Sequence, residues 1–145
     1  MNKLLVRGLK QGRCFLVRLD HGTDIIKQIS DLMDKEKIES ATFWAIGALT
    51  EARIAYYDQA SHEYKTISIN EPVEMVSFTG NVTLRDGKPF IHAHAALAFS
   101  DGKAVGGHLT AGRVFAVEVF MQELFGEPLI REHDSATGLY LWDQL

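Results

Sequence analysis

The chain has 145 residues and a mass of 16.2 kDa, a length typical of a single domain that can bury its own core. Its formal net charge of −4 excludes the strongly basic class of nucleic-acid-binding domains. Because Cys14 is the only cysteine, the chain can form neither an intrachain disulfide framework nor a zinc site built on paired cysteines.

The sequence shows no targeting or membrane segment. The N-terminal apolar run over residues 4–6 is too short for the core of a signal peptide. No stretch approaches the roughly 18 consecutive apolar residues that a membrane-spanning helix requires. We therefore expect a soluble, cytoplasmic protein with one domain over residues 1–145 and no membrane partner.

The first predicted element is a strand over residues 13–19, in which Cys14 is expected to be a small buried side chain. An amphipathic helix over residues 24–38 follows, because apolar side chains recur there at helical spacing and Thr23 or Asp24 can cap its start. From residue 41 onward the pattern predicts strands, over residues 41–49, 53–57, 64–69, 73–84, 88–99, 104–109 and 114–124.

Short turns connect the last four predicted strands. Residues 85–88, 100–103 and 110–113 each contain a glycine in a turn-forming context, and such short connections join antiparallel neighbours. The predicted fold is therefore α+β, a mainly antiparallel sheet with one major helix packed on it as a second layer. The glycine-rich loops of nucleotide-binding proteins and the nucleophile elbow of α/β-hydrolases do not occur in the sequence.

Three of the six histidines are predicted to converge on one face of one hairpin. His92 and His94 share a face of the predicted strand, because side chains alternate along a strand. A two-residue turn would pair His94 with Leu109 and mix apolar and polar residues on both faces. A three-residue turn over residues 100–102 pairs His94 with His108 and keeps one face apolar, so the second register is favoured.

The preceding turn predicts the neighbours of these histidines. A two-residue loop at residues 86–87 sets Asn81 opposite His92 and Thr79 opposite His94. We expect Asn81 and Thr79 to orient the imidazole rings by hydrogen bonds.

Three imidazoles on adjacent strands form a tripod suited to zinc, or to another divalent metal, with a fourth ligand position left open. That position allows two functions, binding of a small molecule or partner, and hydrolase or lyase chemistry by metal-bound water. No carboxylate is an evident general base, since Glu118 shares the parity of His108 but is predicted to lie too far away to ligate within one subunit. The alternative without a metal is three hydrogen-bonded histidines on a partly polar face.

Three further residues are candidates for a pocket. Gly106 and Gly107 would give a ligand close access to the backbone beside His108, or would instead serve close packing of strands. Tyr57 is a candidate for the wall of a cleft, or is a half-buried structural side chain.

The segment 114–125 is apolar on both faces, and a single helix cannot cover both. We therefore expect a second subunit to cover the other face, in a closed homo-oligomer.

Several segments resemble the plant- and prokaryote-conserved (PPC) domain. They are the strand at residues 73–84, the Ile-His-Ala-His motif at 91–94, and the Gly-Gly-His-Leu motif at 106–109 with the strand that follows it. Gly-Ala-Leu at residues 47–49 and Tyr-Asp at 57–58 match the upstream part of the pattern. The resemblance covers nearly the whole chain.

This resemblance implies an α+β fold, a homotrimer, and a zinc-like metal on His92, His94 and His108, as in prokaryotic members of the family. Plant members carry a DNA-binding AT-hook, and prokaryotic members are often named as predicted DNA-binding proteins by that association. This sequence contains no Arg-Gly-Arg-Pro hook, so it does not support DNA as a partner. A DNA-associated regulator is kept as a further alternative, because the naming of the family suggests it. We expect a metal-binding protein with a small-molecule or partner-binding, regulatory role, and a metal-dependent hydrolase or lyase is the first alternative.

Overall fold

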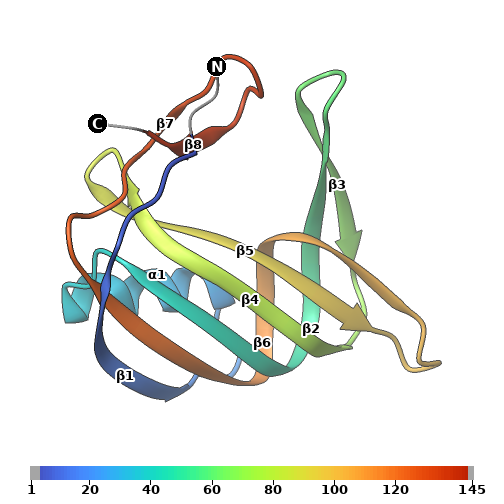
Figure 1. The fold of residues 1–145 in the computed structure, drawn as a ribbon. Coiled ribbons are helices and arrows are strands. Elements are labelled where there is room, and N and C mark those ends of the chain that lie inside the picture. The colour runs from blue at the N-terminus through green and yellow to red at the C-terminus, as the bar shows by residue number, and fades with distance from the viewer. Residues whose placement is uncertain (1–3, 144–145) are drawn as a thin grey trace.

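The computed structural model describes residues 4–143 as an antiparallel sheet with one helix and a small C-terminal hairpin (Figure 1). In chain order the elements are β1 (Lys10–Arg18), α1 (Ile25–Glu36), β2 (Ala41–Asp58), β3 (Glu63–Ile69), β4 (Val73–Arg85), β5 (Lys88–Ala98), β6 (Ala104–Phe125), β7 (Arg131–His133) and β8 (Tyr140–Trp142). The predicted α+β fold class is confirmed, as is the helix. No helix within residues 4–143 is long and apolar enough to cross a membrane.

The sheet closes on itself through its two longest strands. Its strand order is β1-β6-β5-β4-β2-β3, and β6 also pairs with β2, so that β2, β4, β5 and β6 form a ring of neighbours. All pairings within this sheet are antiparallel. The curvature visible in Figure 1 gives the sheet an inner face that lines the core and an outer face turned away from it.

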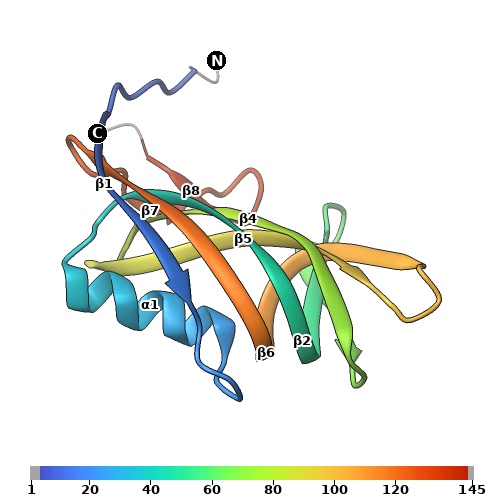
Figure 2. The ribbon, with the colours of Figure 1, turned by 90° about the horizontal axis from the view of Figure 1, so that it is seen from below.

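The helix covers the inner face of the sheet. Its side chains Ile25, Ile29 and Met33 are fully buried in a core cluster shared with β2, β4, β5 and β6. Burial of each such side chain stabilises the fold by about 1.5–3 kcal/mol. One carboxylate oxygen of Asp24 caps the first turn of the helix, as predicted, and the other accepts a hydrogen bond from the Gly112 N–H at 3.1 Å. This second bond fixes the start of α1 to β6, and Figure 2 shows the helix lying along the sheet.

Two predicted strand breaks do not exist, because β2 and β6 are each continuous. The loop predicted over residues 110–112 is wrong: β6 runs unbroken for 22 residues, and β2, predicted as two strands, runs for 18. A Cβ on Gly112 would lie 2.9 Å from Leu49 Cδ1 and 3.3 Å from Ile25 Cγ2. The glycine therefore serves close packing of β6 on the core, and register shifts beside Leu49 and Arg53 let the long strands bend together.

Cys14 lies on β1 as predicted, but its side chain is exposed rather than buried. The physical reason is strand parity. Phe15 and Val17 are the β1 residues that pack against the core, so Cys14 faces the other way, with its Sγ 2.9 Å from Oε1 of Gln122.

The C-terminal segment adds a short hairpin that the sequence pattern did not indicate. Its strands β7 and β8 pair with Arg131 opposite Trp142. The Leu84 N–H donates to the Leu129 carbonyl at 3.1 Å, and the Trp142 indole N–H donates to Thr83 Oγ1 at 3.1 Å. These bonds hold the hairpin against the end of β4.

Candidate metal centre

Two turns set the registers that bring the histidines together. The β5–β6 turn is the predicted three-residue loop, in which Gly102 has a φ of 83° and beyond which His94 pairs with His108. The β4–β5 turn is the predicted two-residue loop, and both of its residues, 86–87, have positive φ. Both register predictions are confirmed.

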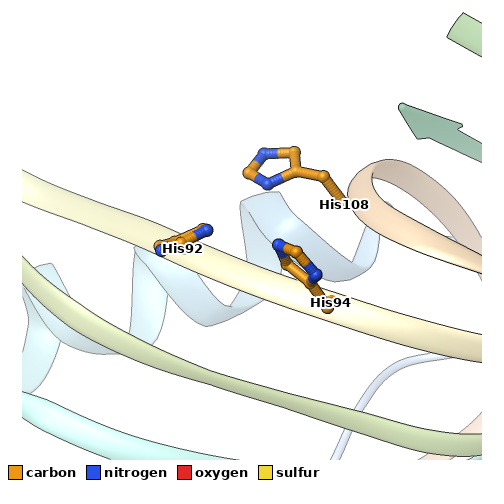
Figure 3. Close-up of side chains that lie close together, drawn as sticks. All are labelled: His92, His94 and His108. Atoms are coloured by element: carbon orange, nitrogen blue, oxygen red, sulfur yellow. The ribbon is translucent and has the colours of Figure 1, made fainter. Parts of the chain in front are cut away.

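The imidazole rings of His92, His94 and His108 face one another across β5 and β6 (Figure 3). The ring centroids are 5.2 Å apart for His92 and His94, 5.3 Å for His92 and His108, and 5.5 Å for His94 and His108. One nitrogen of each ring lies within 4.8 Å of one nitrogen of each of the others. His94 is exposed while the other two are partly buried, so the triad is open to solvent on one side.

The surroundings of the triad favour neutral imidazoles, the form that binds metals. Burial lowers the pKa of His92 to about 4, and the positive charge of nearby Arg131 adds to that shift, followed by His108 and His94. Burial also lowers the pKa of His108, with further contributions from His94 and Arg131. At neutral pH these two rings therefore present free nitrogen lone pairs.

The donor set fits a divalent metal. A tetrahedral zinc ion with bonds of about 2.0–2.1 Å would hold its nitrogen ligands roughly 3.3 Å apart. The nitrogens of the triad all lie within 4.8 Å of one another, so small side-chain rotations reach that spacing. Imidazole suits zinc, copper, iron and nickel, so the residues alone do not select the ion. Metal ligation by these three residues stays a prediction.

Asn81 and Thr79 occupy the predicted positions, opposite His92 and His94 respectively. The predicted hydrogen bonds to the rings are not formed anywhere in the part of the chain that the structure describes. Asn81 Oδ1 instead accepts a hydrogen bond from Arg131 Nη2 at 2.9 Å, and Thr79 is exposed. Asn81 therefore anchors an arginine rather than an imidazole.

Gly106 and Gly107 serve strand packing rather than ligand access. Both glycines pair with β5, and the pairing of β6 with β2 begins at the next residue, His108, opposite Ala55. A Cβ on Gly107 would lie 2.9 Å from the Ala55 carbonyl oxygen, and one on Gly106 would lie 3.0 Å from the Ala95 carbonyl oxygen. The two glycines let the three strands approach closely enough to place His108 beside β5.

Tyr57 is separated from the triad by the ring of Tyr64. Its ring centroid is 4.9 Å from that of Tyr64, which in turn is 5.6 Å from that of His108. The Tyr57 hydroxyl donates to the Thr137 carbonyl at 2.5 Å. Tyr57 therefore holds the C-terminal segment in place behind the site and does not itself contact a histidine of the triad.

Glu118 lies away from the triad, exposed on the outer face of the sheet. Its partners across the strands are Arg18 and Ile46. The hairpin expected to bring it back toward His108 does not exist, because both residues lie on the same continuous strand, ten positions apart. Within one chain, Glu118 can act neither as a ligand nor as a base for this site.

A cavity of about 410 Å³ opens beside the triad, lined by His92 and His108 on one side. Arg85 and Arg131 line it as well, and neither was among the predicted site residues. A signal for Arg85 was available, because polar residues alternate along this part of β4 and continue the polar face of the histidines. Arg131 carried no local signal, because only the unpredicted hairpin brings it to the site.

The chain matches known proteins over most of its length. The family model of the Plants and Prokaryotes Conserved (PCC) domain matches residues 6–125. A metal-containing protein from Archaeoglobus fulgidus is 43% identical, with a TM-score of 0.94 over 97% of this chain and 100% of that one. A plant- and prokaryote-conserved (PPC) protein from Pyrococcus horikoshii is 39% identical, with a TM-score of 0.93 over 98% of this chain and 99% of that one.

Two more distant similarities extend this comparison. A candidate DNA-binding protein from Ralstonia eutropha JMP134 is 27% identical, with a TM-score of 0.80 over 90% of each chain. The bifunctional protein GlmU of Synechococcus sp. (strain JA-3-3Ab) is 26% identical over 129 residues, which are 87% of this chain and 20% of GlmU. The chain thus spans about a fifth of the length of that curated relative.

Proposed function

Because this chain belongs to the Plants and Prokaryotes Conserved (PCC) domain family, we propose that it is a metal-binding protein that holds zinc through His92, His94 and His108. The site would bind a small molecule or a partner in a regulatory role. The observation that carries this proposal is the convergence of three ring nitrogens within 4.8 Å. The 43% identical protein from Archaeoglobus fulgidus, which is metal-containing, supports it. A bound zinc ion would supply a Lewis acid with an open coordination position.

A metal-dependent hydrolase or lyase is the second candidate, favoured by the cavity that His92 and His108 share. Hydrolysis at such a site commonly uses a carboxylate as general base. Among the residues of the described chain that line the cavity, none is Asp or Glu. We therefore favour binding over turnover.

Elemental analysis of the purified protein tests the metal site. We expect about one zinc per chain in the unaltered protein and at least a tenfold lower content in His92→Ala and His108→Ala. The reason is that loss of one of three protein ligands greatly weakens the affinity for zinc. His133→Ala is the matched control, since this histidine is exposed on β7, and it should keep its zinc. Circular dichroism would confirm that all variants fold. Stoichiometric zinc in both triad variants would overturn the proposal.

We further propose that the protein is a homotrimer, as the family resemblance implies. Support comes from an outer apolar patch, formed by Leu16, Trp44, Ile46, Val76 and Phe120. Leu16 is 86% exposed and Ile46 58%, and Phe120 stacks on Trp44 with a centroid distance of 4.2 Å. A contiguous apolar surface of this kind is typical of subunit interfaces.

Light scattering coupled to gel filtration tests the assembly. The unaltered protein should have a mass of three times the 16.2 kDa of one chain. Ile46→Glu would place a charge in the outer apolar patch and should give a monomer. Ile67→Glu is the matched control, because Ile67 is 52% exposed on β3, outside the patch. A monomeric unaltered protein would exclude the trimer.

DNA binding is not part of this proposal, although the Ralstonia relative is named for it. The net charge of −4 offers little attraction to phosphates. Retention of the protein on duplex DNA at low salt, lost steeply as salt rises, would reverse this conclusion.

A further inference from the structure

The C-terminal hairpin places a buried arginine beside the histidine triad. Arg131 is 6% exposed, and its guanidinium donates three hydrogen bonds. Nε donates to Thr83 Oγ1 at 3.1 Å, Nη1 to the Tyr140 carbonyl at 3.0 Å and Nη2 to Asn81 Oδ1 at 2.9 Å. All three acceptors are neutral, so they orient the guanidinium without cancelling its charge.

The charge of Arg131 has no acidic partner in the described part of the chain. None of the ion pairs within residues 4–143 includes it. A guanidinium has five N–H groups, so two remain beyond the three hydrogen bonds. Burying a cation without a counter-charge is unfavourable, and an anion that reached this position would offset that cost.

The cavity beside Arg131 gives an anion access to it. Arg131, Arg85, His92 and His108 all line this space of about 410 Å³, and no Asp or Glu is among its described lining residues. Arg85 adds a second guanidinium, stacked over the ring of Tyr140 at 3.3 Å from the centroid. Among the ion pairs within residues 4–143, Arg85 forms a single one, with its exposed neighbour Asp86 at 3.6 Å. The lining therefore carries net positive charge.

The remaining walls of the cavity are largely apolar or aromatic. They include Tyr64, Phe90, Leu139, Tyr140 and Leu141. The volume lies within the range of roughly 300–1,000 Å³ of sites that hold small organic molecules, which is more room than an inorganic ion fills. The charge and the walls together select an organic anion with an apolar body.

We propose that this cavity binds a small organic carboxylate, with the carboxylate on Arg131, Arg85 at the rim and the body of the molecule against the aromatic wall. One guanidinium matches the single negative charge of a carboxylate and its planar, two-oxygen geometry. The other end of the ligand reaches the histidine triad. This inference deepens the proposed function. It depends on that function only for the zinc ion at the histidine triad, and the carboxylate site stands on the arginines and the cavity.

Four of the residues proposed to contact the ligand lie outside the matched family domain. The family match ends at residue 125, whereas Arg131, Leu139, Tyr140 and Leu141 belong to the segment that follows. The histidine face would thus supply the metal ligands, and the C-terminal hairpin would share the recognition of the ligand with Tyr64, Arg85 and Phe90.

Calorimetric titration with 3-phenylpropanoate tests the inference, with neutral 3-phenylpropanamide and inorganic phosphate as comparison ligands. On the unaltered zinc-loaded protein, the acid should bind at least tenfold more tightly than the amide, because only the acid forms charged hydrogen bonds. Phosphate should also bind at least tenfold more weakly, because it has no apolar body. Equal affinity of acid and amide, or tighter binding of phosphate, would overturn the inference.

Variants locate the anion. Arg131→Met should weaken binding of the acid at least tenfold and Arg85→Met about threefold, since the second guanidinium is closer to solvent. Arg53→Met is the matched control, an exposed arginine on β2 outside this cavity, and should bind as the unaltered protein does. If circular dichroism shows that Arg131→Met does not fold, Arg85→Met and the comparison of acid with amide still test whether the carboxylate binds in this cavity. Unchanged affinity in a folded Arg131→Met would refute the assignment.

Zinc content, measured on the same samples, separates this inference from the proposed function. Stoichiometric zinc with no preference for the acid would reject the carboxylate site and leave the metal site standing. Arg131-dependent binding of the acid by a protein without zinc would reject the metal site and leave the carboxylate site standing.

Discussion

Glu123 and Arg131 are the buried charged residues of the described chain, and the fold treats them in opposite ways. Glu123 is 4% exposed and accepts two side-chain hydrogen bonds from Arg13, at 2.7 Å from Nε and 3.0 Å from Nη2. Arg13 also contacts Glu36 at the end of α1. Arg131 is 6% exposed and is bonded only to neutral acceptors. One charge is neutralised by the fold, and the other is held in position without being neutralised.

The two charges also lie on opposite faces of the same sheet. Glu123 pairs with Ala41, which pairs on its other side with Val82 of the buried core. Arg131 bonds to Asn81, the neighbour of Val82 along β4, whose side chain points to the other face. On the inner face, the charge of Glu123 is thus paired within the protein. On the outer face, the charge of Arg131 is left for the proposed ligand to pair with.

The largest effect should come from making the same substitution at both arginines. Arg13→Met leaves the Glu123 carboxylate buried without a counter-charge, which is strongly unfavourable. Arg131→Met removes three hydrogen bonds to neutral acceptors and the cation–π contacts with Phe90 and Trp142. It also removes the cost of burying a charge without a counter-charge, so the net loss of unfolding free energy should be about 1 kcal/mol. We expect Arg13→Met to lose at least twice as much in urea titrations. Equal losses would mean that the two charges are equivalent to the fold.

Ligand-dependent stability should distinguish the two sites next. At ten times its dissociation constant, 3-phenylpropanoate should raise the unfolding free energy of the unaltered protein by about 1.4 kcal/mol. The same increase is expected in Glu123→Gln, whose carboxylate-binding cavity is intact. Arg131→Met, which should bind the acid at least tenfold more weakly, should show an increase of at most about 0.4 kcal/mol at that concentration. A similar increase in all three proteins would place the bound anion elsewhere.

A smaller difference is expected in the pH dependence of stability. Hydrogen bonds from Arg13 hold the pKa of Glu123 below its ordinary value of 4.5. Because the unfolded chain takes up this proton first, the contribution is present above about pH 4.5 and is lost as pH falls through the lower pKa of the folded state. Urea titrations between pH 6 and 3 should therefore show a shallower loss in Glu123→Gln. Arg131→Met should also show a shallower loss, but through His92 and His108, whose pKa the charge of Arg131 lowers. A loss in Glu123→Gln as steep as that of the unaltered protein would contradict the assignment to Glu123.

The smallest effect belongs to an exposed pair that serves as a baseline. Lys27 and Asp31 form an i,i+4 ion pair at 2.6 Å on the solvent side of α1, with side chains 72% and 59% exposed. Lys27→Met should change the unfolding free energy by only about 0.3 kcal/mol. A loss as large as that of Arg13→Met would show that burial is not what separates these charges.

The histidine triad could be predicted from the sequence because local rules determine it. Short turns at residues 86–87 and 100–102 have few allowed conformations, and the alternation of apolar residues selects one register for each. His94 opposite His108 follows directly from these two facts. The prediction needed no information from distant parts of the chain.

Other features could not be predicted, because contacts distant in sequence decide them. Gly112 has the appearance of a turn residue, but its small size is required by Leu49 and Ile25, which pack against it. Arg131 lies in a polar segment with no periodic pattern, and its role depends on Thr83 and Asn81 of β4. Reading Gly112 as a turn also misplaced Glu118, because the error at one residue reversed the direction of the strand that follows.

The continuity of β6 has a consequence for how the protein opens. The strand carries His108 near its start and Phe120 of the outer apolar patch near its end, and it is paired with β1, β2 and β5. Its central amides can exchange with solvent deuterium only when several neighbours separate at once, so they should be among the last to exchange. A metal on His108 and a subunit against Phe120 would each suppress the same opening reaction. Each would therefore favour the other without any change of shape, and zinc should slow deuterium uptake at the distant end of the strand.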